Sequence, residues 1–319
     1  MITEETFTAV SLFKYRLPFK SPLQLSETRL EQRRVLLLQC ITNKEEYWLE
    51  CSPLPAYSQN TLEDCIEQLK SVFAQLTGAS LSLLKKTITN DKHLLPSISF
   101  PLNDLFERSL DKTAVCPVNI CPLILDDEIL LDSPVLKLKV GQNSIEEDID
   151  RIQTILSSKA FTGCLRLDAN QQWLKSDIEQ LSKTVDCSRI EWLEDPLLNT
   201  ADYKEWQSFS AIALALDESL YQAHISFLEK LNPKALILKP AMLGWQGLQH
   251  YIELANNNCW RTIISSSFEG PIGMAALTRF AQKLSPDEFH GLDTLKYFPD
   301  EYQHKLVHKN LDLVERWRW

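Results

Sequence analysis

The sequence lacks the features of several common protein classes. No apolar run approaches the roughly 18 residues of a membrane-spanning helix, and the first residues, MITEETFTAV, lack the basic start and apolar stretch of a secretory signal. Neither GxGxxG nor a P-loop sequence follows the first strand of the α/β-patterned region, so a nucleotide-binding doubly wound fold loses its usual signature. We therefore expect a cytoplasmic protein with no membrane partner.

Positive charge is also scarce. The chain has 33 Lys and Arg against 43 Asp and Glu, a formal net charge of −10, whereas a nucleic-acid site needs clustered cations. A local pair of lysines can still bind a small anion. The eight cysteines are scattered and include no CxxC pair; Cys116 and Cys121 are closest and have no nearby His. This distribution predicts reduced thiols rather than a disulfide framework or a zinc site.

The first hundred residues have the pattern of an α+β module. Alternating runs at 34–40 and 46–50 predict antiparallel strands. A helix is expected from about Thr61 to Leu76, with its N-cap at Asn60 or Thr61 and acids in its first turn. We expect residues 1–100 to form a capping domain, against which residues 295–319 pack back.

From about residue 115 onward, short β-rich runs alternate with amphipathic helical stretches at 144–156, 175–183 and 244–255. Such alternation implies βαβ crossovers and a parallel sheet. Seven runs favour a closed TIM-type (β/α) barrel over residues 101–294. The runs are Ile120–Leu125, Val135–Val140, Cys164–Asp168, Ile190–Glu194, Ala211–Asp217, Ala235–Lys239 and Thr262–Ser267.

An ionisable residue closes each of five of these runs, at intervals of roughly 22 to 29 residues: Lys139, Asp168, Glu194, Asp217 and Lys239. The carboxyl ends of barrel strands meet at one mouth, where chemistry is placed. A single acid there is more often a helix cap, and Asp217 could cap the helix after it. All five in phase favour one shared cavity, with Ser265 and Ser266 closing the last run.

Strand alternation assigns these side chains to one face. Lys137 and Lys139 are two residues apart, as are Arg166, Asp168 and Asn170 in the next strand, so each set shares a face. A covered parallel strand is normally almost wholly apolar, and buried ions need partners. For Arg166 two roles stay open, contact with an anion or a salt bridge within the barrel.

Three carboxylates without His or Cys form an all-oxygen site that suits Mg²⁺, or Mn²⁺ in its place. A substrate carboxylate bound there would be stabilised as an enediolate forms. A nearby cation and partial burial lower the pKa of a lysine, which would let the neutral amine act as a base. The residues therefore indicate proton abstraction beside a carboxylate.

The order of motifs resembles the enolase superfamily, in its muconate-lactonizing subgroup. The motifs are Lys137-Leu-Lys139, Asp168-Ala-Asn170, Glu194-Asp-Pro196, Asp217-Glu-Ser219 and Lys239-Pro240. Within the subgroup, the chain is most similar to the o-succinylbenzoate synthase family of the short proteobacterial type. Supporting segments are Ser52-Pro-Leu-Pro-Ala-Tyr-Ser-Gln, Leu165-Arg-Leu-Asp-Ala-Asn, Ile264-Ser-Ser-Ser and Gly291-Leu-Asp-Thr.

This resemblance implies an enolase-like modified barrel with a capping domain. It also implies a lyase of menaquinone biosynthesis that dehydrates 2-succinyl-6-hydroxy-2,4-cyclohexadiene-1-carboxylate to o-succinylbenzoate. Lys139 would remove the proton alpha to the carboxylate and return it to the departing hydroxide, Lys137 would assist, and Lys239 would stabilise the dienolate. Asp168, Glu194 and Asp217 would hold Mg²⁺. The expected substrate-binding residues are Ser265, Ser266, Asn170, Arg166 and Arg29.

The sequence departs from the family pattern at three places. Asp195 stands where Glu or Gln is more usual, a change that we expect to matter little. Gly270-Pro271 follows Glu269 where small residues or Ser are common, which bears on contacts with the substrate tail. The segment Phe19–Arg33, a loop that closes over the ligand in this family, is rich in charge and contains Arg29.

Two other functions remain open at this stage. An N-acylamino acid racemase or dipeptide epimerase would use the same five residues on two faces of one carbon. A catalytically silent barrel acting as a binding protein would instead have its lysines in salt bridges and no metal. As partners we expect a small carboxylate substrate, no nucleic acid and no membrane, with the chain a monomer or weak homo-oligomer.

Overall fold

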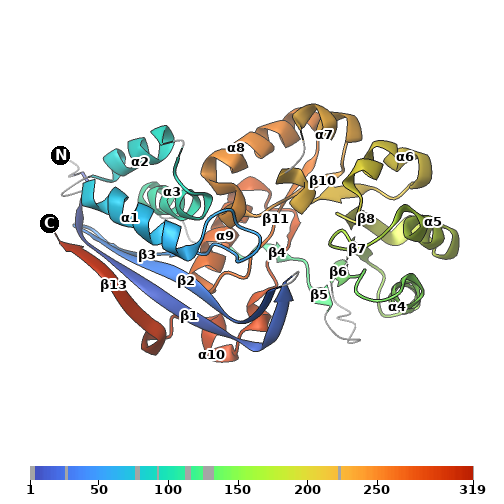
Figure 1. Cartoon of the computed structure of the whole chain (residues 1–319), viewed down its shortest axis with the longest axis horizontal. Helices are drawn as coiled ribbons and strands as arrows, with labels where there is room; N and C mark the ends of the chain where they lie inside the picture. Colours follow the sequence, from blue (N-terminus) through green and yellow to red (C-terminus); the bar gives the residue numbers. More distant parts are fainter. Residues whose placement is uncertain are drawn as a thin grey trace.

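The computed structural model describes residues 4–25, 28–75, 80–91, 93–111, 116–124, 133–221 and 224–318. Figure 1 shows two units side by side, an antiparallel sheet with helices packed on it and a barrel surrounded by helices. Among the described residues, no helix is both long and apolar enough to cross a membrane. All eight cysteines are free, as expected.

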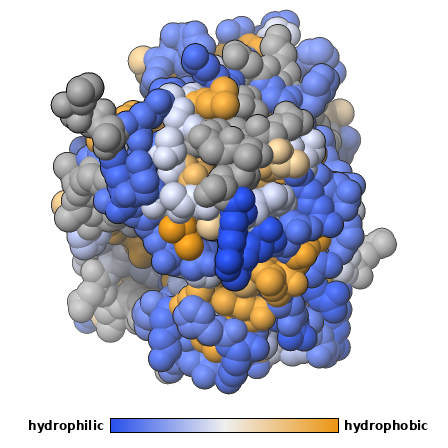
Figure 2. All heavy atoms as spheres, turned by 90° about the vertical axis from the view of Figure 1, so that its left-hand side faces the viewer, coloured by the Kyte–Doolittle hydropathy of each residue, from blue (hydrophilic) through white to orange (hydrophobic). Residues whose placement is uncertain are grey.

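The capping domain is built on a four-stranded antiparallel sheet. Its order is β13 (Leu311–Arg318), β1 (Phe7–Leu25), β2 (Thr28–Thr42) and β3 (Glu46–Cys51). The end of the chain thus lies in the same sheet as its beginning. The strands predicted at 34–40 and 46–50 lie within β2 and β3. Figure 2 shows the surface at this end of the molecule as mostly hydrophilic, crossed by a band of apolar residues.

Both faces of this sheet are covered in β2. Leu36 and Leu38 pack with helices α1 (Leu62–Gln75), α2 (Leu81–Asn90) and α3 (Pro96–Leu110). Val35 and Leu37 point the other way, toward Phe298 and Tyr302 of the C-terminal segment. This two-sided burial explains why the run is continuously apolar.

The predicted first helix is confirmed in α1. Thr61 is its N-cap: the Thr61 Oγ1 accepts from the Asp64 backbone N–H at 3.1 Å, and an Asp64 carboxylate oxygen accepts from the Thr61 backbone N–H at 2.8 Å. This reciprocal pair satisfies two of the backbone donors that a helix start leaves unpaired.

The expectation of a loop at Phe19–Arg33 was wrong. The segment is the outer part of the β1–β2 hairpin, with Leu23 opposite Leu30 and Gln24 opposite Arg29; residues 26 and 27 lie outside the described part of the chain. Successive side chains of a strand alternate between its two faces. The charged residues of this segment are therefore those expected of a strand with one face in solvent. Phe19 points inward and stacks on Phe298, with ring centroids 5.0 Å apart.

The barrel prediction is confirmed. Seven parallel strands follow one another in chain order, and every predicted run overlaps one of them. The strands are β5 (Leu123–Ile124), β6 (Val135–Lys139), β7 (Cys164–Asp168), β8 (Ile190–Glu194), β9 (Leu214–Leu216), β10 (Ala235–Leu238) and β11 (Arg261–Ile264).

A short eighth strand, which the sequence did not reveal, completes the ring. Strand β12 (Phe289–His290) pairs with β4 (Asn119–Ile120), just before β5 in the chain. On its other side, Gly291 bridges to Ser265 at the end of β11. Two residues are too few to show a periodic pattern, so β12 has no signal of its own.

Helices cover the outside of the barrel (Figure 1). The predicted stretches appear as α4 (Ile145–Ser157), α5 (Lys175–Thr184) and α8 (Pro240–Asn258). Between these helices and the strands lies the largest apolar cluster. The remaining helices are α6 (Trp206–Phe209), α7 (Ile225–Leu231), α9 (Pro271–Leu284), α10 (Asp300–Gln303), η1 (Cys187–Arg189), η2 (Thr200–Glu205), η3 (Glu218–Tyr221), η4 (Leu295–Tyr297) and η5 (His308–Asn310).

Candidate active site

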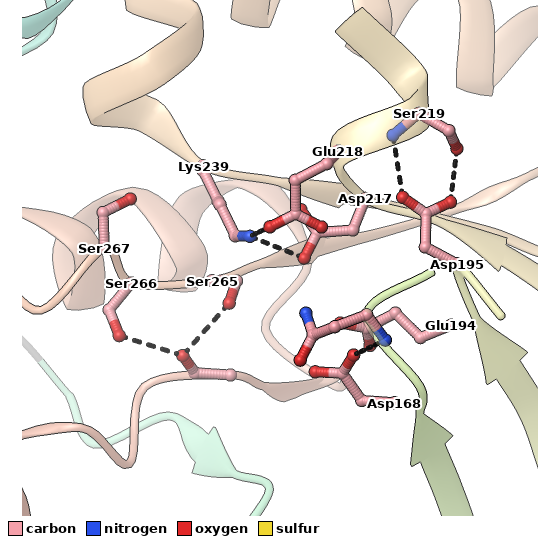
Figure 3. A network of polar contacts seen from close by, with 12 residues as sticks. Asp168, Glu194, Asp195, Asp217, Glu218, Ser219, Lys239, Ser265, Ser266 and Ser267 are labelled. Atoms are coloured by element: carbon pink, nitrogen blue, oxygen red, sulfur yellow. Dashed lines mark hydrogen bonds and ion pairs between the residues drawn. The ribbon is translucent and has the colours of Figure 1, made fainter. Parts of the chain in front are cut away.

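Three carboxylates meet inside the barrel at the carboxyl ends of neighbouring strands. Asp168 ends β7 and is paired in register with Glu194, which ends β8. Asp217 directly follows β9 and lies two residues beyond Ala215, the partner of Glu194. Their exposed fractions are 3%, 2% and 2%. Figure 3 shows the three acids gathered at this end of the barrel.

The lysines of β6 face these acids. Lys137 Nζ lies 2.8 Å from an Asp168 carboxylate oxygen and 2.5 Å from a Glu194 carboxylate oxygen. Lys139 Nζ donates to the side-chain oxygen of Asn170 at 2.8 Å and lies 3.9 Å from Asp168. The Lys139 side chain is 35% exposed, against 14% for Lys137. Lys139 is therefore the lysine of this pair that an incoming ligand can reach.

Lys239 occupies the opposite side of the acids. Its Nζ lies 2.6 Å from Asp217 and 2.5 Å from Glu218 (Figure 3). Sequence reasoning did not single out Glu218, although it stands in the quoted motif Asp217-Glu-Ser219. The structure thus brings together all three predicted lysines and all three predicted acids.

Charge and burial compete in this cluster. Burial alone would lower the pKa of Lys137, but the charges of Asp168 and Glu194 outweigh it and raise that pKa. The same balance, with Asp217 and Glu218, raises the pKa of Lys239. The sequence argument expected a nearby cation and partial burial to lower lysine pKa values; burial acts in that sense here, and the carboxylates beside Lys137 and Lys239 act against it. Burial raises the pKa of Glu194 and of Asp217.

The donor set suits a hard divalent cation, because it consists of carboxylate oxygens in a buried, charged cluster. One Asp217 carboxylate oxygen has no hydrogen-bond partner among the described residues. Among the residues that the structure describes, no group of three Asp, Glu, His or Cys side chains is already arranged so that it could hold a metal ion. Lys137 and Lys239 contact the acids instead.

Asp195, next to Glu194, has a structural task. It is buried and accepts hydrogen bonds from Ser219, one from the backbone N–H at 2.7 Å and one from the hydroxyl. Figure 3 shows this pair beside Asp217. Asp195 therefore fixes the turn that carries Asp217 and Glu218.

The predicted serines lie at the barrel mouth. The hydroxyls of Ser265 and Ser266 donate to the carbonyl oxygen of Gly291 at 3.5 Å and 3.3 Å (Figure 3). The hydroxyls of Ser266 and Thr294 are 2.6 Å apart. Contact of these serines with a substrate stays a prediction.

Arg166 has the second of the two roles left open above. Its guanidinium is 2.6 Å from Glu191, donates to the carbonyl oxygen of Phe289 and lies 4.0 Å from the Trp192 ring centroid. Arg166 comes two residues before Asp168 in β7 and therefore lies deeper in the barrel. It forms a salt bridge there rather than facing the three acids. Arg29 lies near the hairpin tip, opposite Gln24, and its contact with a ligand stays a prediction.

Sequence reasoning missed Tyr57, although the segment that contains it was among the quoted motifs. Tyr57 lies on the loop that follows β3 in the capping domain. Its pKa is raised by burial and then by the charge of Glu218, with Lys239 acting in the opposite sense. The capping domain thus contributes a half-buried phenol whose pKa responds to charges of the cluster.

Comparison with known proteins places the chain among enzymes. Residues 132–314 match a family model described as enolase C-terminal domain-like, and residues 7–104 match one described as MenC, N-terminal domain. The o-succinylbenzoate synthase of Pasteurella multocida (strain Pm70) is 31% identical over 307 residues, covering 89% of this chain and 88% of that protein. The chain belongs to the o-succinylbenzoate synthase family. As a member it is a lyase of menaquinone biosynthesis, as the sequence predicted.

A second member of this family, from Yersinia enterocolitica serotype O:8 / biotype 1B, is 29% identical over 303 residues, with 90% of each chain covered. Solved structures support the enolase-like fold. The o-succinylbenzoate synthase of Thermosynechococcus elongatus BP-1, solved with Mg in its active site, has a TM-score of 0.73 at 20% identity, covering 93% of this chain and 95% of that one. The L-Ala-D/L-Glu epimerase of Bacillus subtilis has a TM-score of 0.74 at 18% identity, with 91% of each covered.

Proposed function

We propose that this o-succinylbenzoate synthase family member dehydrates 2-succinyl-6-hydroxy-2,4-cyclohexadiene-1-carboxylate by abstracting the proton alpha to the ring carboxylate. One observation carries the assignment of residues. The lysines of β6 and the lysine that follows β10 lie on opposite sides of three buried carboxylates at the barrel mouth. A carbon held between them has a nitrogen base on one side and a fixed positive charge on the other.

Asp168, Glu194 and Asp217 would hold Mg²⁺, with Mn²⁺ an alternative of the same chemistry. When bound, the cation supplies positive charge beside the substrate carboxylate, where negative charge grows as the proton leaves. The unpartnered oxygen of Asp217 and the all-oxygen donor set support this assignment.

Lys139 is the proposed base. Its Nζ is the more exposed of the two β6 amines, and Asn170 orients it by accepting its hydrogen bond. Lys139 would take the alpha proton and return it to the hydroxide that leaves the neighbouring ring carbon, so that water is released and the ring becomes aromatic. Lys137 would assist from beside it, and Lys239 would stabilise the dienolate by its charge.

Further proposals concern substrate contacts and context. Ser265, Ser266, Asn170 and Arg29 are proposed to contact the substrate; for Arg166 the salt bridge to Glu191 leaves an indirect role in supporting the barrel interior. We also propose a cytoplasmic location, and a monomer or weak homo-oligomer. The boundary between the two domains, expected near residue 100, is proposed to lie after α3 instead, because that helix packs on the capping sheet through Ile98, Leu102 and Leu105.

The deciding experiment measures Mg²⁺-dependent formation of o-succinylbenzoate by the wild type and by Lys139→Ala. We expect the variant to lose roughly 10²- to 10⁴-fold in kcat, the usual contribution of a general base, with Mg²⁺ binding retained. An N-acylamino acid and a dipeptide are assayed in parallel. Epimerisation without dehydration would overturn the proposed substrate, and an active Lys139→Ala would overturn the assigned base.

A further inference from the structure

Two charged residues of the capping domain are buried although the proposed reaction does not use them. Arg33 in β2 is 0% exposed and Glu50 in β3 is 6% exposed. Each contacts both of two loops, the capping loop (Ser52–Gln59), which follows β3, and the barrel loop (Ser265–Gly270), which follows β11. Burial of this charge has a cost that must be offset by specific contacts.

Arg33 distributes its three nitrogens between the loops. Its Nη1 donates to the carbonyl oxygen of Pro53 at 3.0 Å, and its Nη2 donates to that of Ser52 at 3.1 Å. Its Nε donates to the carbonyl oxygen of Phe268, in the barrel loop, at 3.2 Å. A planar guanidinium holds its five donors in a rigid, wide fork and so reaches three separate backbone oxygens in a fixed geometry, whereas the compact ammonium group of lysine has three rotatable donors on one atom.

Glu50 makes the complementary contacts with backbone donors. Its carboxylate accepts from the Gly270 N–H at 2.7 Å, from the Gly273 N–H at 2.9 Å and from the Ser52 hydroxyl at 2.6 Å. Gly270 and Gly273 flank the start of α9, so an acid of the capping domain caps a barrel helix. A Cβ on Gly270 would lie 3.1 Å from a Glu50 carboxylate oxygen, which shows how close this approach is.

The barrel loop is held in a conformation that its own sequence disfavours. Phe268 has a φ of 59°, in the left-handed region that non-glycine residues rarely adopt. Such a backbone persists only where the surroundings fix it. Besides Arg33, the ring of Phe19 from the β1–β2 hairpin packs edge-on against Phe268, at 6.0 Å between centroids.

Each loop carries polar residues of the candidate site. The barrel loop begins with Ser265 and Ser266 at the barrel mouth (Figure 3), and the capping loop carries Tyr57, whose pKa is raised by burial and by the charge of Glu218. The contacts of Arg33 and Glu50 therefore fix the loop that carries Tyr57 relative to the loop that carries the serines.

We propose that Arg33 and Glu50 are positioning residues that clamp the capping loop to the barrel loop and so fix the walls that receive the substrate tail. The inference rests on the proposed function of the site. The clamp touches neither the proposed metal ligands nor the lysines, so its role is to shape the substrate site rather than to take part in the chemical step.

The test uses the variants Arg33→Lys and Glu50→Gln, which keep volume and, for lysine, charge. Matched controls are Arg34→Met and Glu46→Gln, exposed neighbours on the same two strands. KM and kcat for dehydration, Mg²⁺ affinity and amide hydrogen exchange of residues 265–273 are measured for each. We expect KM to rise roughly tenfold or more in the clamp variants, with kcat changed less, Mg²⁺ affinity as in the wild type, and faster exchange in this segment.

Three other results would count against the proposed role of Arg33 and Glu50. A lowered melting temperature with KM and segment exchange unchanged would mean a purely structural role and overturn the proposal. A loss of Mg²⁺ affinity equal to the loss of activity would do so too. If the wild type does not dehydrate the substrate, the proposed function fails, and the exchange data alone judge the clamp: exchange as in the controls would refute it.

Discussion

The Lys137 ammonium group lies 2.5 Å from a Glu194 carboxylate oxygen, although their strands, β6 and β8, are separated in the sheet by β7. Both side chains point into the barrel and meet above the intervening strand. Asp168 of β7 lies 2.8 Å from the same nitrogen. One ammonium group is thus shared between two acids from two different strands.

Replacing Lys137 by methionine should expose the repulsion between these acids. Without Mg²⁺, we expect the free energy of unfolding to fall by roughly 3–5 kcal/mol, the usual effect of removing one partner of a buried ion pair. Added Mg²⁺ should restore more stability in the variant than in the wild type, because the cation no longer competes with an ammonium group. Thermal unfolding with and without Mg²⁺ measures both effects. Lys183→Met is the control, since its side chain is 77% exposed; equal behaviour of the two variants would contradict this account.

Asp217→Asn tests the third proposed ligand. Asp217 has one carboxylate oxygen 2.6 Å from Lys239 and another without a hydrogen-bond partner among the described residues. We expect Mg²⁺ binding to weaken by about tenfold or more, which is about 1.4 kcal/mol, and dehydration to be lost with it. Titration calorimetry and turnover check this, with Asp287→Asn, an exposed site, as control. Undiminished Mg²⁺ affinity would exclude Asp217 as a ligand.

Glu269 should make stability depend on pH. Burial, with Glu50 adding to it, raises the pKa of Glu269 from 4.5 to about 7. Its raised pKa favours the folded state fully below pH 4.5, and this contribution is lost as pH rises through about 7. Relative to Glu269→Gln, the wild type should therefore lose up to about 3 kcal/mol over that window. Urea unfolding between pH 4 and 9 measures the difference, with Glu229→Gln, an exposed site, as control. A difference independent of pH would contradict the prediction.

Two glycines on barrel helices should respond oppositely to alanine. A Cβ on Gly273 would lie 2.7 Å from Cβ of Glu269 and 3.1 Å from Cδ of Glu50, so we expect Gly273→Ala to destabilise the fold by roughly 1–3 kcal/mol. At Gly247 in α8 the nearest atom is 3.4 Å away, on Leu243, and alanine should be neutral or stabilising by up to about 1 kcal/mol. Chemical denaturation measures the free energy of unfolding of both variants. A Gly273→Ala variant as stable as the wild type would contradict the prediction, because it would show that the side chains of Glu269 and Glu50 can move aside.

The sequence alone determined five members of the charged cluster and the face of each strand from which they point. Side chains alternate along a strand, and parallel strands end at a common edge, so the phase of Lys137, Asp168, Glu194, Asp217 and Lys239 was sufficient to predict that they meet. The same pattern determined the barrel itself, apart from the two-residue strand β12.

Tertiary structure decided how those groups pair and what surrounds them. Lys137 pairs with Glu194 because β6 and β8 lie on either side of β7 in the sheet. Arg166 pairs with Glu191 because both side chains lie deeper in the barrel than the cluster of acids. Arg33 and Glu50 gave no signal, because their partners Phe268 and Gly270 are 235 and 220 residues away and contribute only backbone atoms. Local periodicity encodes the direction of a side chain, whereas the backbone groups that it meets depend on long-range packing of the whole chain.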